Sequence, residues 1–241
     1  MKKIITTAAV CILLVVSACK KESSSTTNTT TPTSTCMVQS INYGDGSADS
    51  YTYDSQNRLS RNVFVQDTLT SQTDYTYAGK IVTAATAGGF TQLFYLNSNG
   101  FADSSVMDYA GIIHITSVYK YNSQNQATSM ITSGNYFTTP VNESTTYEYT
   151  GGNKSKETYN DGTTTSVTTY DYYTDKADPA KKSMEAINFV NGNTNLLKTE
   201  TVDGTDVTSY TYEYDSTGKP TKRTATSTGN PVVSTIAWTC K

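Results

Sequence analysis

A short phrase, Tyr-X-Tyr followed by a turn, recurs along the chain and constrains its fold more than any other feature. Its clearest copies are YTYD at residues 51–54 and YEYD at residues 212–215, each followed by polar residues typical of turns. Most copies lie about 18 to 28 residues apart, a spacing that suits a repeating unit of two strands. Exact or loose copies begin at Tyr51, Tyr75, Leu93, Tyr119, Tyr147, Tyr170 and Tyr212.

A second set of turns lies between these copies, including Asp45-Gly46, Asp161-Gly162 and Asp203-Gly204. Asp-Gly and Asn-Gly supply the positive φ that tight hairpins need. Segments between turns number about 17, and no helical-period segment is long enough for a crossover. Consecutive strands with short loops pair antiparallel, so we expect an all-β, up-and-down meander. The longer gap after Tyr172 predicts a change of register near residues 188–200.

Alternation with period two places both tyrosines of each copy on one face of the sheet. Around Tyr119, this face also contains Ile113 and Ile115, and the other contains His114, Thr116, Val118 and Lys120. A sheet of this length would expose its edges and its tyrosine face, so it should curl or close. We expect either a large flattened barrel or two packed sheets.

The N-terminus reads as a targeting signal. Lys2 and Lys3 precede the apolar segment 4–16, and Val16-Ser17-Ala18-Cys19 resembles the lipobox of bacterial lipoproteins. The resemblance implies a cleaved signal peptide (1–18) and a lipid anchor on Cys19, with a generic secretory signal as the alternative. Lys20 after the cysteine favours the outer membrane. Residues 19–35 are a Ser/Thr-rich tether that we expect to be flexible, and residues 36–241 form a single β-meander domain.

Two cysteines remain for the domain. Cys36 stands at its start and Cys240 one residue from the end of the chain. An exported protein meets an oxidising compartment, which predicts a Cys36–Cys240 disulfide; two unrelated thiols are the alternative. We expect the single tryptophan, Trp238, to pack in the same region.

Residues 212–219 and 51–59 resemble the YD repeat of Rhs-type proteins, whose β-sheets spiral into hollow shells. The whole arrangement, from about residue 38 to residue 225, is similar to a family of bacterial lipoproteins of unknown function with a porin-like β fold. This resemblance implies the fold and an exported location, and it implies no activity.

The sequence contains few of the residues and motifs that are typical of a catalytic site. The formal net charge is -3 without a basic stripe, which argues against nucleic acid as a partner. His114 is expected to face solvent, and neither a nucleophile motif nor a set of His and Cys ligands for a metal or cofactor is present. Asp54, Asp171 and Asp215 are interpreted as turn residues, with a glycosidase carboxylate pair as the alternative. We therefore expect a non-enzymatic protein without cofactor or metal.

Rows of tyrosine suit the binding of sugar rings, because aromatic faces stack on them and hydroxyls form hydrogen bonds. We expect an outer-membrane lipoprotein, facing the periplasm or the cell surface, that binds a glycan or another envelope component. The alternative is a structural scaffold for protein contacts; an integral porin is rejected because outward positions are Thr, Lys, Glu and Asp. The candidate ligand-binding residues are the second tyrosines of the copies: Tyr53, Tyr77, Tyr121, Tyr149, Tyr172 and Tyr214.

Overall fold

The computed structural model describes residues 35–241. The predicted signal peptide, the lipidation site Cys19 and the tether up to residue 34 lie outside the described residues.

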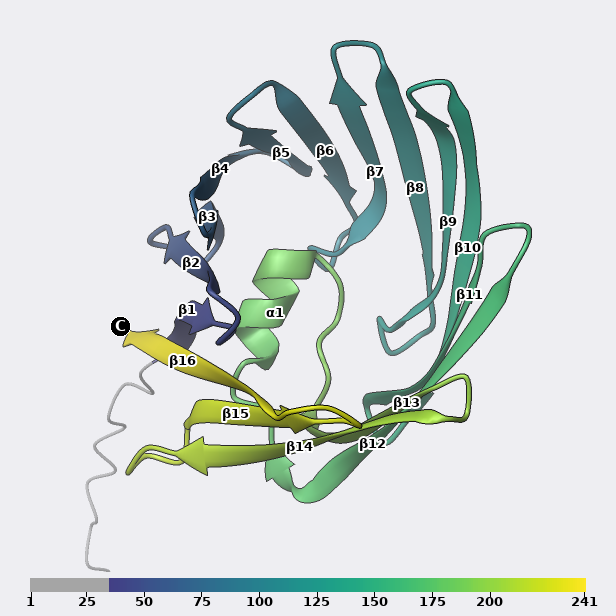
Figure 1. Cartoon of the computed structure of the whole chain (residues 1–241). Helices are drawn as coiled ribbons and strands as arrows, with labels where there is room; N and C mark the ends of the chain where they lie inside the picture. Colours follow the sequence, from purple (N-terminus) through teal and green to yellow (C-terminus); the bar gives the residue numbers. More distant parts are fainter. Residues whose placement is uncertain (1–34) are drawn as a thin grey trace, which may run out of the picture. The chain divides into compact units, whose positions relative to one another are not determined.

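Sixteen antiparallel strands close into one barrel within residues 35–241 (Figure 1). Each strand pairs with the next in sequence, and the last strand pairs with the first. The predicted meander is confirmed, in the form of a barrel rather than two packed sheets and with sixteen strands against the expected 17 or so. The strands are β1 (Cys36–Asn42), β2 (Ser47–Tyr53), β3 (Leu59–Gln66), β4 (Leu69–Ala78), β5 (Ile81–Thr86), β6 (Phe90–Leu96), β7 (Ala102–Tyr109), β8 (Ile113–Tyr121), β9 (Ala127–Tyr136), β10 (Thr139–Thr150), β11 (Asn153–Asn160), β12 (Thr165–Ala177), β13 (Asn195–Val202), β14 (Asp206–Tyr214), β15 (Pro220–Thr226) and β16 (Val232–Cys240).

The repeating unit is a hairpin made of an odd-numbered strand and the even-numbered strand that follows it. We call the end of the barrel where one unit passes to the next the turn end, and the opposite end the hairpin end. Four connections at the turn end are built alike: the side-chain oxygen of the first turn residue accepts the backbone N–H groups two and four residues later, which closes the turn without help from the sheet. These first residues are Asp54, Asn97, Asn122 and Asp215.

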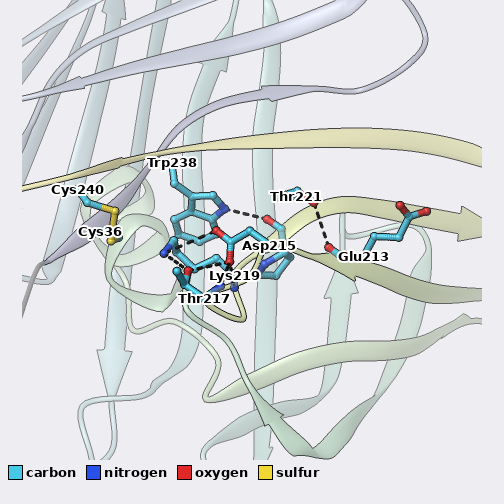
Figure 2. Close-up of polar contacts among 9 residues, drawn as sticks. Cys36, Glu213, Asp215, Thr217, Lys219, Thr221, Trp238 and Cys240 are labelled. Atoms are coloured by element: carbon cyan, nitrogen blue, oxygen red, sulfur yellow. Dashed lines mark hydrogen bonds and ion pairs between the residues drawn. A yellow bond between two sulfur atoms is a disulfide. The ribbon is translucent and has the colours of Figure 1, made fainter.

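The fourth residue of each of these turns has a positive φ. It is Asn57, Gly100, Asn125 or Gly218, the residue types that adopt this backbone conformation most easily. Figure 2 shows the Asp215 turn, in which Thr217 and Lys219 contact the Asp215 carboxylate. The predicted turn roles of Asp54 and Asp215 are confirmed. The same prediction for Asp171 is wrong: it lies within β12, where its carboxylate accepts a hydrogen bond from Thr199 on β13.

An aromatic side chain near the end of an even strand binds the start of the preceding odd strand in six of these units. Each donates a hydrogen bond of 2.7 to 3.0 Å to a backbone carbonyl next to a bulge in the pairing. Trp238 takes the place of tyrosine in the last unit, beside the disulfide (Figure 2). The donor and acceptor pairs are Tyr53–Val38, Tyr77–Leu59, Tyr121–Ala102, Tyr172–Lys154, Tyr212–Leu197 and Trp238–Pro220.

The core is a ring at the turn end. Every odd strand places a buried residue at or within two positions of its start, so each unit contributes one member. The members are Val38, Leu59, Val82, Ala102, Ala127, Asn153, Leu196 and Pro220. The ring surrounds the centre of the barrel at this end, where Leu59 packs with Met37 and Tyr53, and Val82 and Ala102 pack with Phe189.

A helical segment occupies that centre. The connection between β12 and β13, residues 178–194 (hereafter the plug), contains the helix α1 (Lys181–Asn188), which Figure 1 shows inside the ring of strands. The fully buried hydroxyl of Ser183 accepts a 2.8 Å hydrogen bond from the backbone of Val38, and the Phe189 carbonyl accepts one from Ala102. The plug therefore supplies partners for backbone donors at the starts of β1 and β7 that the sheet leaves free.

The interruption of the repeat was predicted at this place, and the helix was not. Its eight residues are too few to display a helical period, and Ala180 at its start forms no side-chain cap. No helix in the described part of the chain is long and apolar enough to cross a membrane.

The barrel closes where its first strand, β1, pairs with its last strand, β16. Cys36 and Cys240 face each other in the register of β1 and β16, and they form a disulfide with an S–S distance of 2.07 Å. The predicted bridge is thus confirmed. It lies at the turn end, the same end as the buried ring and the plug.

Candidate functional site

The plug does not fill the barrel, and cavities remain on different faces of α1. Ser183 of the helix binds the backbone of β1, and Ile187 packs against the cluster of Met37, Tyr53 and Leu59. Met184 and Asn188 border a cavity of about 330 Å³, which we call the lumen cavity. Glu185, Ala186 and Phe189 border a second cavity of about 240 Å³, which we call the turn cavity.

The lumen cavity has a tyrosine wall and an amide wall. The strands β8, β9 and β10 provide Tyr119, Ala127, Tyr147 and Tyr149, while β11 provides Lys154 and Glu157. The plug closes the other side with Asp178, Met184, Asn188 and residues 190–193. Aromatic faces, amides and one ion pair thus converge on a volume suited to a small polar ligand.

Lys154 and Glu157 form an ion pair in this cavity and neutralise each other. The Lys154 ammonium lies 2.5 Å from the Glu157 carboxylate, and both side chains are roughly three-quarters buried. Lys154 also lies over the rings of Tyr170 and Tyr147, with its nitrogen 4.6 and 5.5 Å from their centroids. Its position is therefore set by contacts on several sides, and it presents no free charge to the cavity.

The tyrosine hydroxyls of the wall remain protonated. Burial raises the pKa of Tyr149 to about 12, with a further contribution from the Glu157 charge. Burial likewise raises the pKa values of Tyr119 and Tyr147 above the ordinary value. These groups are neutral donors and acceptors at any physiological pH.

The amide wall is held in place by backbone bonds. The Asn193 side chain accepts a 2.9 Å hydrogen bond from the backbone of Lys154, and the Asn153 side chain accepts bonds from the backbones of Thr194 and Asn195. Burial raises the pKa of Asp178, whose carboxylate accepts a bond from the Ala180 backbone at the start of the plug. The amide wall is thus anchored to β11.

The six tyrosines proposed from the sequence lie in different surroundings. Tyr149 lines the lumen cavity, Tyr77 lines the turn cavity, and Tyr214 lines a surface hollow of about 450 Å³ beside Lys176. The hydroxyls of the other three, Tyr53, Tyr121 and Tyr172, bind backbone carbonyls, as does that of Tyr77. The structure brings one of the six into the lumen cavity.

Sequence reasoning missed most of the lumen cavity. Tyr119 and Tyr147 are the first tyrosines of their copies. Period two places the first and second tyrosines on the same face, and it does not indicate which of the two forms a hydrogen bond to a backbone carbonyl. The Lys154 and Glu157 pair carries a weak signal, because residues three apart in a strand normally face opposite ways and meet here beside a bulge. Nothing in the sequence indicated that residues 188–193 would reach the tyrosine wall.

Other polar groups offer little for chemistry. His114 is exposed on the outer wall, with its Nδ1 atom 3.3 Å from an Asp108 carboxylate oxygen. Among residues 35–241, no group of three or more His, Cys, Asp or Glu side chains is placed to hold a metal ion.

Comparisons with known proteins bear on the fold. No family model matches the chain, and no curated protein matches it. Two crystal structures are similar: a porin-like protein from Bacteroides uniformis ATCC 8492, with 14% identity and a TM-score of 0.68, and one from Bacteroides vulgatus ATCC 8482, with 12% identity and a TM-score of 0.56. The matches cover 85% and 83% of this chain, and 96% and 98% of those chains. The described domain therefore has a porin-like β-barrel fold.

Proposed function

We propose that this protein is a non-enzymatic binding module of the bacterial cell envelope, and that its lumen cavity holds a sugar unit of a glycan. The observation that carries the proposal is the pairing of three tyrosines with the amide-lined plug around about 330 Å³. Ligand pockets begin at about this size, and a mono- or disaccharide is of matching dimensions.

The chemistry of the walls favours a neutral, hydroxyl-rich ligand. Tyrosine rings stack on the C–H faces of sugars, and protonated hydroxyls and asparagine amides both donate and accept hydrogen bonds. The only cation among the residues that line this cavity, Lys154, is paired with Glu157, so an anionic ligand would lose its hydration without gaining a free partner. Because Glu157 is bound to Lys154 and Asp178 to the plug backbone, these carboxylates serve structure rather than catalysis.

The location is proposed from the sequence and supported by the outer wall. The lipobox-like tetrad ending at Cys19 would anchor the chain to the outer membrane through lipid. Outward positions of the strands include the exposed residues Lys120 and Glu148, and Asp74, which pairs with Arg61. A wall with such charges suits a barrel that stands in water, tethered beside the membrane.

A glycan and peptidoglycan binding screen tests the proposal. We expect a neutral oligosaccharide to bind, and Tyr147→Ala to weaken that binding at least tenfold by removing one face of the cavity. Tyr136→Ala, at the exposed hairpin end, is the matched control and should bind normally. Absence of binding to any glycan, or equal loss in both variants, would refute the lumen cavity as a sugar site.

One observation favours a second candidate, a scaffold for protein contacts. Ile81, Tyr95, Val118 and Ile131 are exposed on the outer wall. Ile81 pairs with Tyr95 and Val118 with Ile131, and Ser104 of β7 pairs with both Tyr95 and Val118, so the four lie in one row interrupted by a serine. Apolar groups gathered outside a barrel are typical of a contact surface. Val118→Asp should disrupt such contacts and leave glycan binding intact, so this variant and Tyr147→Ala separate the two functions.

A further inference from the structure

The turn cavity lies on another face of α1 from the lumen cavity and is a site of a different kind. Three turn-end connections form its rim, with Asn57 and Arg58, Gly79, and Gly100. The side chains of Tyr77, Leu96, Ala186 and Phe189 make its interior largely apolar, and Glu185 adds a carboxylate.

One polar atom of this cavity has no partner. The Oδ1 atom of Asn57 is buried and forms no hydrogen bond. Leaving a buried acceptor unsatisfied costs about 1–3 kcal/mol, and native proteins rarely tolerate it without a reason. Since Asn57 borders the turn cavity, a rotation of its side chain toward a ligand there would give this oxygen the missing donor.

The repeats provide an internal comparison for this atom. Asn125 holds the same place in the β8–β9 turn, and its Oδ1 accepts a 2.7 Å hydrogen bond from Asn99. The other two turns of this type have Gly100 and Gly218 at the position. The backbone therefore does not require an asparagine here, and the open oxygen is particular to the turn cavity.

Two charged residues, Arg58 and Glu185, also border the turn cavity. The Arg58 guanidinium is bound to the Asp54 carboxylate at 2.7 Å and stacks over the Tyr77 ring, 4.2 Å from its centroid. Glu185 is mostly buried, with Lys182 at 3.1 Å on one oxygen and the Gly192 N–H at 3.4 Å from the other. The Arg58 charge is thus balanced by Asp54, and the acceptors that border the cavity are Asn57 Oδ1 and the Glu185 carboxylate.

We propose that the turn cavity is a second binding site, which takes a compact apolar group bearing N–H donors, such as an aromatic amidine or amine. Its ring would lie among Tyr77, Leu96 and Phe189, and its N–H groups would donate to Asn57 Oδ1 and to the Glu185 carboxylate. This site is separate from the lumen cavity and does not depend on glycan binding.

Benzamidine is a suitable probe, measured by calorimetry and saturation-transfer NMR on the intact purified chain. We expect Asn57→Gly to weaken benzamidine binding at least fivefold, because it removes the acceptor while glycine is accepted at this turn position. Asn125→Gly is the matched control and should bind benzamidine normally. Glu185→Gln, which keeps the side-chain shape, should also weaken binding, and provides a second variant if Asn57→Gly folds poorly.

Benzoate tests the polarity of the site, since it has the same ring and presents acceptors instead of donors. We expect no benzoate binding. The proposal fails if benzamidine does not bind, if both glycine variants and Glu185→Gln bind it as well as the unmodified protein, or if benzoate binds equally well. Glycan binding measured on the same samples reports on the lumen cavity alone.

Discussion

The two ends of the barrel are made of the same strands and differ sharply in how they are packed. The turn end holds the buried ring, the plug, the disulfide and the aromatic hydrogen bonds to strand starts. The hairpin end exposes large apolar side chains, among them Leu69, Ile112, Tyr136 and Phe137, although Ile113 is an exception with 1% exposure. The strands follow one repeating sequence pattern, yet the apolar core of the barrel lies mainly at one end.

The interior between the ends explains this asymmetry. Several buried inward positions along the strands are hydroxyl residues, such as Ser105, Thr132 and Thr145, and Ser117 and Thr132 bind each other at 3.0 Å. Such a wall tolerates water, so the hydrophobic contribution to folding comes chiefly from the turn end. Both the lumen cavity and the turn cavity border the plug at that end, where the surrounding residues are packed.

Alkaline pH should produce the largest effect, because it acts on many turn-end tyrosines together. Burial raises the pKa values of Tyr53 and Tyr77 to about 12, above the ordinary value of 10.0 that applies in the unfolded chain. Their contribution to stability is complete below pH 10 and is lost as the pH rises toward 12. We expect cooperative unfolding in this window by circular dichroism, together with tyrosinate absorbance at 295 nm. Ionisation of the buried tyrosines together with the exposed ones near pH 10, in a barrel that stays folded, would contradict the burial of this end.

Removing the disulfide should have the next largest effect. Cys36 and Cys240 are separated by 204 residues, and the chain-entropy model gives about 5 kcal/mol for closing a loop of that length. We expect the double variant Cys36→Ser, Cys240→Ser to lose about 2–5 kcal/mol in urea unfolding. Hydrogen exchange should rise first at the turn end of the β1–β16 seam, at Met37 and Thr239, and less at Ile41 and Ile236. Uniform exchange along the seam would show that closure does not depend on this end.

A pair of leucine substitutions compares the two ends directly. Leu59 is 0% exposed in the turn-end ring, whereas Leu69 is 61% exposed at the hairpin end. Leu59→Ala should lower the free energy of unfolding by about 3 kcal/mol, because it leaves a cavity in the core. Leu69→Ala should change it by less than about 0.5 kcal/mol. Equal losses in the two variants would mean that the hairpin end carries as much of the core.

Features repeated locally could be predicted from the sequence, and features that depend on closure could not. Period two and the turn residues gave the antiparallel meander, and the two cysteines gave the seam. Whether the sheet closes or packs on itself depends on the curvature summed over all strands. No local sequence pattern indicates that sum. The plug was missed because α1 is short and is stabilised by partners far away in sequence, such as Val38 for Ser183.

The candidate site, like the fold, could be predicted from the sequence only in part. Of the tyrosines predicted to bind a ligand, Tyr149 lines the lumen cavity, while Tyr53 is 8% exposed and bound to a carbonyl. The bulge before the second tyrosine does not decide its role, because the same bulge precedes Tyr53, which binds a strand start, and Tyr149, which lines the lumen cavity. Residue types in a Tyr-X-Tyr phrase are the same in both cases, so composition does not separate the two roles.

The smallest predicted effect isolates one of these aromatic hydrogen bonds. Tyr121 donates its hydroxyl to the Ala102 carbonyl at 2.7 Å, next to the point where the pairing of β8 with β9 shifts. Tyr121→Phe keeps the ring and removes the donor, so it should cost about 1 kcal/mol in urea unfolding, the typical net contribution of a hydrogen bond. Tyr136→Phe, at the hairpin end and 51% exposed, should change stability by less than about 0.5 kcal/mol. If both substitutions cost the same, the recurring bonds are incidental to ring packing; a loss confined to Tyr121→Phe would show that the hydroxyl itself secures the two strands of one unit to each other.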